Sequence, residues 1–83
     1  MELTVKVKLG NMPTMKKVAQ AAAKMSTFES LVLLRREDIT VNAKSLMGLL
    51  SLGIHDGDGV TIIAHGEDEA QAVCAMADLL QNG

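Results

Sequence analysis

Two short apolar runs on either side of a charged turn constrain the fold of this chain more than any other feature. Residues 31–34 read Leu-Val-Leu-Leu, residues 39–41 read Ile-Thr-Val, and residues 35–38 between them read Arg-Arg-Glu-Asp. Apolar runs of strand length that are separated by a short polar turn predict a β-hairpin. A hairpin requires at least two strands of the sheet to run antiparallel.

A strand and a helix are predicted before the hairpin. Residues 3–9 alternate apolar with polar side chains, which is the pattern of a strand with one buried face. Turn-forming residues at 10–13 end that pattern. A helix then begins with Thr14 as its predicted N-cap, directly after Pro13. Its apolar and small positions recur at steps of three and four residues, namely Met15, Val18, Ala19, Ala22 and Met25.

Two helices and one strand are predicted after the hairpin. Residues 45–52 predict a short helix that Ser45 caps and that ends near Gly53. The last strand is predicted at 60–64. An acidic stretch at 67–69 suits the positive end of a terminal helix. The predicted apolar stripe of that helix consists of Ala70, Val73, Cys74, Ala77 and Leu80.

The predicted elements follow the order strand, helix, strand, strand, helix, strand, helix. Helices interleaved with an antiparallel hairpin indicate an α+β sandwich, in which three helices cover one face of a four-stranded antiparallel sheet. The other face is expected to be largely solvated. A chain of 83 residues has room for one core, so we expect a single domain over residues 1–83.

The composition limits the core and its chemistry. The chain is 48% apolar, with six Met residues and one aromatic residue, Phe28, so the core is expected to be aliphatic and rich in Met. Cys74 is the single cysteine and falls within a helical apolar pattern, which predicts a buried structural thiol instead of a reactive one. We expect neither a metal nor a cofactor.

Membrane and nucleic-acid roles are not expected. The longest apolar run is far shorter than the roughly 18 residues that a membrane span needs. The first residues lack the basic region and long apolar stretch of a signal peptide, so we expect a cytoplasmic protein. The net charge of −2 and the single aromatic residue offer little to a nucleic acid.

Charge is unevenly distributed along the chain. All eight Lys and Arg residues lie at or before Lys44, against four acids, which gives a net +4. From Ser45 onward, six acids and no Lys or Arg give −6. This asymmetry indicates either a basic face for an acidic or phosphorylated partner, or solvated surface charge that interleaves in space.

The second half of the chain carries a family resemblance. The stretch VNAKSLMGLLSLGIHDGDGVTIIAHGEDEAQAV, residues 41–73, closely resembles the histidine-containing phosphocarrier (HPr) family of the bacterial sugar phosphotransferase system. Within it, AKSLMGLLSLGI is similar to the regulatory-serine motif of that family. The resemblance extends back through Phe28 and Gln20 to the first strand. It implies an open-faced sandwich, βαββαβα, and protein partners from the phosphotransferase system.

The start of the first predicted helix departs from the family pattern. Carrier members of the family have a Gly-Leu-His-x-Arg-Pro-like sequence there, in which the His accepts a phosphoryl group and the Arg assists. In a gapless alignment the His position falls on Thr14, the Arg position on Lys16 and the Pro position on Lys17, and neither His55 nor His65 reaches this site. A Thr hydroxyl without a nearby base is a poor nucleophile, so we do not expect phosphoryl relay through Thr14.

The same helix start has features of an anion-binding site. Its first-turn N–H groups lack helical partners and lie at the positive end of the helix dipole. The candidate anion-binding residues are Thr14, Met15, Lys16 and Lys17. The alternative is that Thr14 only caps the helix and both lysines are solvated.

Ser45 matches, by resemblance, the serine that a dedicated kinase phosphorylates in many relatives. A phosphate near a helix start is favoured by the helix dipole. Leu46, Met47 and Leu50 would lie close by, and the corresponding positions in the family form an exposed apolar patch for partner docking. The alternative is that Ser45 serves only as an N-cap.

His55 stands in an acidic turn beside Asp56 and Asp58, and this grouping of residue types suggests metal binding as one hypothesis. Closely spaced groups on one loop seldom form a closed set of metal ligands, so a histidine in a surface turn is expected. The Asp-Gly-Asp-Gly run also lacks the length and terminal Glu of a calcium-binding loop.

Three hypotheses about function follow. The favoured one is a non-catalytic family member, not an enzyme, that acts by binding proteins of the phosphotransferase system, a serine kinase or a transcription regulator, with Ser45 as its regulatory site. The second is a phosphoryl carrier that uses His55, His65 or Thr14 as the acceptor. The third is reuse of the fold for an unrelated interaction.

Overall fold

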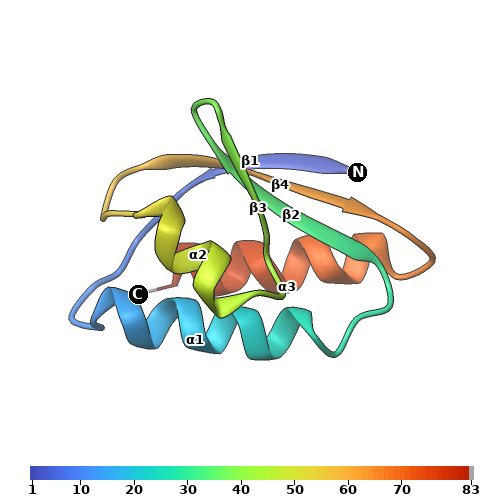
Figure 1. Ribbon diagram of the computed structural model, residues 1–83, viewed down its shortest axis with the longest axis horizontal. Coiled ribbons are helices and arrows are strands. Elements are labelled where there is room, and N and C mark those ends of the chain that lie inside the picture. The colour runs from blue at the N-terminus through green and yellow to red at the C-terminus, as the bar shows by residue number, and fades with distance from the viewer. Residues whose placement is uncertain (83) are drawn as a thin grey trace.

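The protein consists of one sheet and one layer of helices (Figure 1). The computed structural model describes residues 1–82 of the chain. Three helices cover one face of a four-stranded sheet, with α1 lying furthest from the strands. The elements in chain order are β1 (Glu2–Lys6), α1 (Thr14–Met25), β2 (Leu31–Arg36), β3 (Ile39–Asn42), α2 (Leu46–Leu52), β4 (Gly59–His65) and α3 (Glu69–Gln81).

The strands lie in the order β1-β4-β2-β3, and every neighbouring pair is antiparallel. β4 therefore lies between β1 and β2, where Val5 pairs with Val60 and Leu34 pairs with Ile62. The predicted hairpin is β2–β3, although Arg35 and Arg36 extend β2 and do not belong to the turn. This arrangement confirms the predicted βαββαβα open-faced sandwich.

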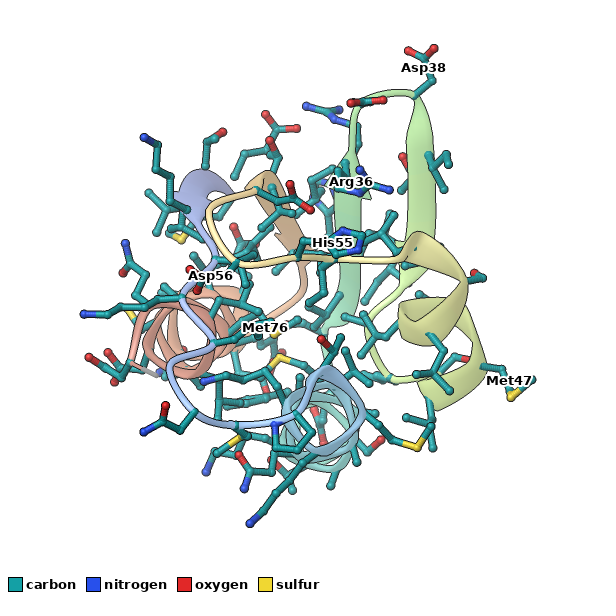
Figure 2. The ribbon with its side chains drawn as sticks, turned by 90° about the vertical axis from the view of Figure 1, so that its left-hand side faces the viewer. Arg36, Asp38, Met47, His55, Asp56 and Met76 are labelled. Atoms are coloured by element: carbon teal, nitrogen blue, oxygen red, sulfur yellow. The ribbon has the colours of Figure 1, made fainter. Side chains whose placement is uncertain are left out.

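The core lies between the sheet and the helices and is aliphatic. Met25 and Met76 are completely buried, and Figure 2 shows Met76 inside the molecule. Phe28 only packs against the edge of this core. Burial of each large aliphatic side chain contributes roughly 1.5–3 kcal/mol, which makes the core the main stabilising element.

The outer face of the sheet is less polar than expected. Thr4 and Thr61 lie there, and their hydroxyl oxygens are 3.0 Å apart in a hydrogen bond. Ile63 is only 9% exposed, although it is not part of the core between sheet and helices. The register places Leu33 opposite Ile63, and this apolar pair covers part of the face.

Asp68 fastens the start of α3 to the start of β2. Its carboxylate accepts hydrogen bonds from the Ser30 hydroxyl, from the Ser30 N–H at 2.9 Å and from the Glu29 N–H at 2.9 Å. These bonds, led by the one from the Ser30 hydroxyl, lower the pKa of Asp68. Asp68, in the acidic stretch before α3, thus binds the segment that leads into β2 in addition to lying at the positive end of the α3 dipole.

The end of α3 is bound by a lysine from α1. Lys17 is 1% exposed, and its Nζ donates to the carbonyl oxygens of Leu79 at 2.6 Å and Asn82 at 2.9 Å. Carbonyl groups at a helix C-terminus carry partial negative charge, so the ammonium group stabilises this end of the helix.

The C-terminal ends of the other two helices also receive cations. Arg36 donates to the Leu52 carbonyl oxygen at the end of α2, from Nε at 3.1 Å and from Nη2 at 2.8 Å. Lys44 donates from Nζ to the Phe28 carbonyl oxygen, just beyond α1, at 2.7 Å. Three of the eight basic side chains therefore bind backbone carbonyls inside the fold.

Two local predictions are wrong. Pro13 is the N-cap of α1, because its φ and ψ of −60° and 145° are extended and its carbonyl accepts the first helical bond from Lys17; Thr14 is already helical. Cys74 is exposed, not buried. Residues 70–77 are apolar almost all round the helix, so the sequence pattern did not identify which side of α3 faces the core.

Candidate functional site

Ser45 precedes α2 and caps it, as predicted. Its backbone is extended, and its Oγ accepts a hydrogen bond from the Gly48 N–H at 3.1 Å. The first turn of α2 contains no acidic residue. A side chain added at Gly48 would come within 3.4 Å of the Ser45 Cβ, so this glycine keeps the space next to the hydroxyl open. The site is therefore a half-buried hydroxyl at the positive end of a short helix.

Three apolar residues of α2 lie next to Ser45 and at the surface. Met47 is 74% exposed and Leu46 40% exposed, while Leu50 is half-buried. Figure 2 shows the Met47 side chain pointing away from the body of the molecule. Met15 at the start of α1, which packs against α2, is 60% exposed. We call Leu46, Met47 and Leu50 the apolar surface.

The start of α1 keeps only part of the predicted anion site. Thr14 is its first helical residue and is half-buried, and Met15 and Lys16 are exposed. Within residues 1–82 the Thr14 hydroxyl makes no hydrogen bond, and no acidic side chain lies in this first turn. A Thr hydroxyl without a base to remove its proton remains a weak nucleophile.

The prediction that Lys17 adds positive charge to this helix start is wrong. Its ammonium group is buried and donates to carbonyl oxygens at the C-terminal end of the neighbouring helix α3. No local sequence pattern indicates this, because Lys17 and Leu79 are 62 residues apart. Lys16 is the remaining basic side chain of the first turn.

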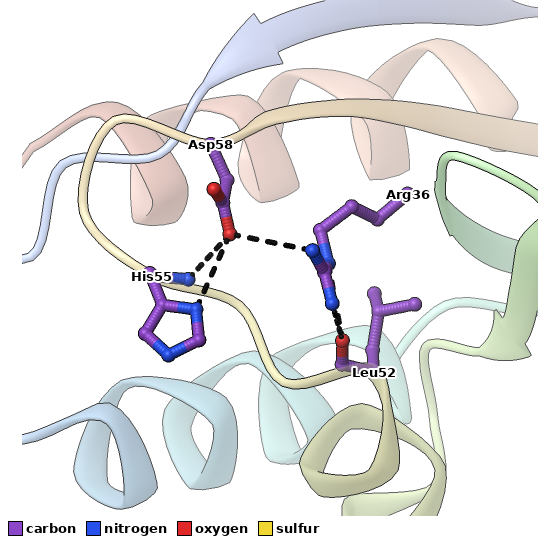
Figure 3. Close-up of polar contacts among 4 residues, drawn as sticks. All are labelled: Arg36, Leu52, His55 and Asp58. Carbon is purple, nitrogen blue, oxygen red and sulfur yellow. Dashed lines mark hydrogen bonds and ion pairs between the residues drawn. The ribbon is translucent and has the colours of Figure 1, made fainter.

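His55 belongs to a polar cluster at the end of α2, shown in Figure 3. The Asp58 carboxylate accepts the His55 backbone N–H at 2.7 Å and lies 3.6 Å from the ring Nδ1. The same oxygen is 4.0 Å from Arg36 Nη1, while Arg36 also binds the Leu52 carbonyl. The cluster therefore holds the backbone of His55 in place. The His55 side chain itself is 80% exposed, so its Nε2 is accessible to solvent.

The remaining polar candidates do not join this cluster. His65 is exposed at the end of β4. Asp56 accepts the Leu9 N–H at 2.7 Å and so fastens the loop after β1. Among residues 1–82 no three His, Cys, Asp or Glu side chains come together as a metal site would require. No helix in this part of the chain has the length and apolarity to cross a membrane.

An open groove between α1 and α3 was not predicted from the sequence. It has a volume of about 510 Å³, and Met12, Gln20, Lys24, Asp78 and Leu79 line it. No motif marks this groove, because its two walls come from opposite ends of the chain.

Comparisons with known proteins agree with the fold. The family model described as "PTS HPr component phosphorylation site" matches residues 1–82. HPr-like protein Crh of Halalkalibacterium halodurans is 34% identical over 80 residues, which cover 96% of this chain and 95% of that protein. HPr-like protein Crh of Bacillus subtilis is 48% identical over 54 residues, which are 65% of this chain and 64% of that protein.

A solved structure shows the same fold along nearly the whole chain. The crystal structure of phosphocarrier protein HPr from Bacillus anthracis superimposes with a TM-score of 0.92 at 32% sequence identity. The superposition covers 98% of this chain and 96% of that one.

Proposed function

Because the chain belongs to the HPr family, we propose that it is a regulatory member that acts by binding protein partners and does not relay phosphoryl groups. The observation that carries this proposal is Thr14, which lies at the start of α1 where the resemblance calls for the phosphoryl-accepting histidine. Relay requires a nucleophile that also releases the group easily, and imidazole has both properties. A Thr hydroxyl without a base has neither.

Ser45 is the proposed regulatory site. Its hydroxyl caps α2, where the helix dipole favours a phosphate of about −2 charge. The glycine at position 48 leaves room beside the hydroxyl. Phosphorylation would add a strong negative charge next to the apolar surface while the helix start keeps an acceptor for its N–H groups.

The apolar surface is the proposed docking site. Leu46 and Met47 are exposed, and large apolar side chains grouped at a surface often mark protein interfaces. Met side chains suit such contacts because they adapt to differently shaped partners. The proposed partners are proteins of the phosphotransferase system, a serine kinase and a transcription regulator. Negative charge on Ser45 would select among them.

Kinase treatment tests this function. Incubation with the serine kinase that modifies HPr proteins, together with ATP, is expected to add one phosphate to Ser45, measured by mass spectrometry. Ser45→Ala should remain unmodified. Ser51→Ala is the matched control, because Ser51 is exposed on the same helix, and it should be modified like the wild type. An unmodified wild-type protein, under conditions that modify a known substrate, contradicts the proposal.

A second candidate function is phosphoryl acceptance at His55. The Asp58 carboxylate beside Nδ1 would hold a proton there and leave Nε2 as the nucleophile. Two nearby aspartates repel an incoming phosphoryl group, which makes this the weaker candidate. Phosphoenolpyruvate with the first enzyme of the phosphotransferase system should then give acid-labile phosphate on the wild type and on His65→Ala, but not on His55→Ala. Absence of acid-labile phosphate on the wild type excludes it.

A further inference from the structure

The groove between α1 and α3 is separate from Ser45 and from the apolar surface. Figure 2 shows α3, in red, on the opposite side of the molecule from Met47. The volume of the groove, about 510 Å³, lies in the range of sites that bind small molecules. None of the functions proposed above uses this groove, so its lining is open to a second binding activity.

The two walls of the groove run in opposite directions. Figure 1 shows α1 and α3 antiparallel, and the two helices pack against each other. The α1 wall consists of Lys17, Gln20 and Lys24, the α3 wall consists of Ala75, Asp78, Leu79 and Asn82, and Met12 lines the groove from the loop before α1. Each wall follows helical spacing over two turns, which is about 10 Å. The groove is therefore too short to seat a partner helix of ordinary length along it.

Part of the lining is apolar and none of it is aromatic. Met12, Ala75 and Leu79 are half-buried, and Phe28, the single aromatic residue of the chain, does not line the groove. A planar ligand therefore finds no ring to stack on. An aliphatic group would remove these three side chains from water, which contributes roughly 25 cal/mol per Å² of apolar surface.

Lys17 closes one end of the groove and is already paired. Its ammonium group donates to the carbonyl oxygens of Leu79 at 2.6 Å and Asn82 at 2.9 Å. The negative end of the α3 dipole offsets its charge. Lys17 thus fixes the two walls relative to each other and is not the group that recognises a charged ligand.

Lys24 and Asp78 carry opposite charges on opposite walls. Both are exposed, and among residues 1–82 neither of them forms an ion pair. Because the helices are antiparallel, Lys24 lies toward the Ala75 end of the α3 wall, one helical turn from Asp78. A ligand with a single charge leaves one of these groups beside a like charge or an apolar group. A ligand that carries both charges pairs with both groups.

We propose that this groove binds a free α-amino acid with an aliphatic side chain, such as leucine. The carboxylate of the ligand pairs with Lys24, its ammonium group pairs with Asp78, and its side chain lies against Met12, Ala75 and Leu79. Both ion pairs lie in an open, solvated groove, so each contributes little. The expected Kd is on the order of a millimolar.

Titration of the full chain with leucine, followed by NMR of the methyl groups, tests the site. The methyl signals of Met12, Ala75 and Leu79 are expected to shift and to saturate. The methyl signal of Met47, on α2, should not move. Glycine has both charges but no side chain, so it should bind at least about fivefold more weakly than leucine.

Removal of one charge at a time identifies the pairing. Leucine amide lacks the carboxylate and 4-methylpentanoate lacks the ammonium group, while both keep the aliphatic chain. At about pH 6 the amino group of leucine amide is charged. Lys24→Gln should weaken leucine binding roughly two- to fivefold without weakening that of leucine amide. Asp78→Asn should weaken leucine binding by a similar factor without weakening that of 4-methylpentanoate.

Two matched variants control for net charge. Lys6→Gln on β1 and Asp38→Asn in the β2–β3 turn remove the same charges from exposed positions outside the groove. Both should bind leucine within about twofold of the wild type, because surface substitutions away from a site have small effects. Figure 2 shows Asp38 at the tip of the hairpin, far from α1 and α3.

Several outcomes would overturn the proposal. The groove is no such site if about 50 mM leucine, far above the expected Kd, gives no saturable shift at Met12, Ala75 and Leu79. Equal binding of glycine and leucine would show that the apolar lining takes no part. If Lys24→Gln and Asp78→Asn weaken leucine, leucine amide and 4-methylpentanoate equally, or have no more effect than the two controls, the charges are not paired as stated.

Discussion

Lys17 carries its ammonium group inside the protein and donates it to two carbonyl oxygens of α3. Its four-carbon stem crosses between the two helices, and its charge meets the negative end of the helix dipole. The neighbouring Lys16 is exposed at the start of α1. Two adjacent lysines thus have different roles, one in holding the fold and one at the surface.

Replacement of Lys17 is therefore expected to destabilise the protein. Lys17→Met keeps most of the apolar stem but removes both hydrogen bonds, so the free energy of unfolding should fall by about 1–3 kcal/mol. Urea denaturation measures this change. Lys16→Met is the control, and its effect should stay within about 0.5 kcal/mol. Equal effects of the two variants would show that the buried hydrogen bonds do not contribute.

Asp68 is expected to make the stability depend on acidic pH. Its pKa in the folded protein lies below the ordinary value of 3.8, because the Ser30 hydroxyl and the Glu29 N–H stabilise the carboxylate. The folded state then binds fewer protons than the unfolded state in this range. The stabilisation is complete above the ordinary pKa and is lost as the pH falls through the lowered one.

Unfolding measured by urea between pH 6 and pH 2 checks this expectation. Asp68→Asn should be less stable than the wild type at pH 6, and the difference should shrink as the pH falls below 3.8. A difference that stays constant over the whole range would mean that the charge on Asp68 is not responsible.

Among the helices, α2 depends most on its ends. It has seven residues, which is too short for a helix that is stable by itself. Ser45 satisfies an N–H at its start, and Gly53 ends it in a left-handed conformation with φ of 66°. Arg36 from β2 binds the last carbonyl of the helix, at Leu52. The ends of this helix are thus held by one cap, one glycine and one distant cation, while its buried side chains Leu49 and Leu52 pack into the core.

Loss of the cap is expected to weaken this helix in a measurable way. Ser45→Ala should lower the free energy of unfolding by about 1 kcal/mol. Ser45→Asp retains an acceptor for the Gly48 N–H and should be closer to the wild type. Thermal and urea unfolding of the three proteins give the comparison. If Ser45→Ala is as stable as the wild type, the hydroxyl has no capping role, and its proposed regulatory role would stand without that structural explanation.

At the scale of the whole molecule, the fold explains the uneven charge. The first 44 residues carry +4 and the rest −6, yet Lys17, Arg36 and Lys44 bind backbone carbonyls at or beyond helix ends. The excess positive charge of the first half is therefore partly used to stabilise helices. This leaves fewer cations for a basic face than the sequence alone indicates.

The order of elements, the hairpin, the aliphatic core and the Ser45 cap followed from the sequence, because periodicity, turn residues and caps depend on neighbours only a few positions apart. The family resemblance located Thr14 and Ser45 for the same reason, since both lie in short contiguous motifs. The buried side of α3 did not follow, because an almost uniformly apolar helix has no distinct stripe.

The tertiary structure alone decided the partners of Lys17 and Asp68 and the groove between α1 and α3. Lys17 is 62 residues from Leu79, and Asp68 is 38 residues from Ser30. Contacts over such separations arise only when packing of the core places the elements next to each other. Their geometry depends on the whole set of buried side chains, so no short stretch of sequence contains it.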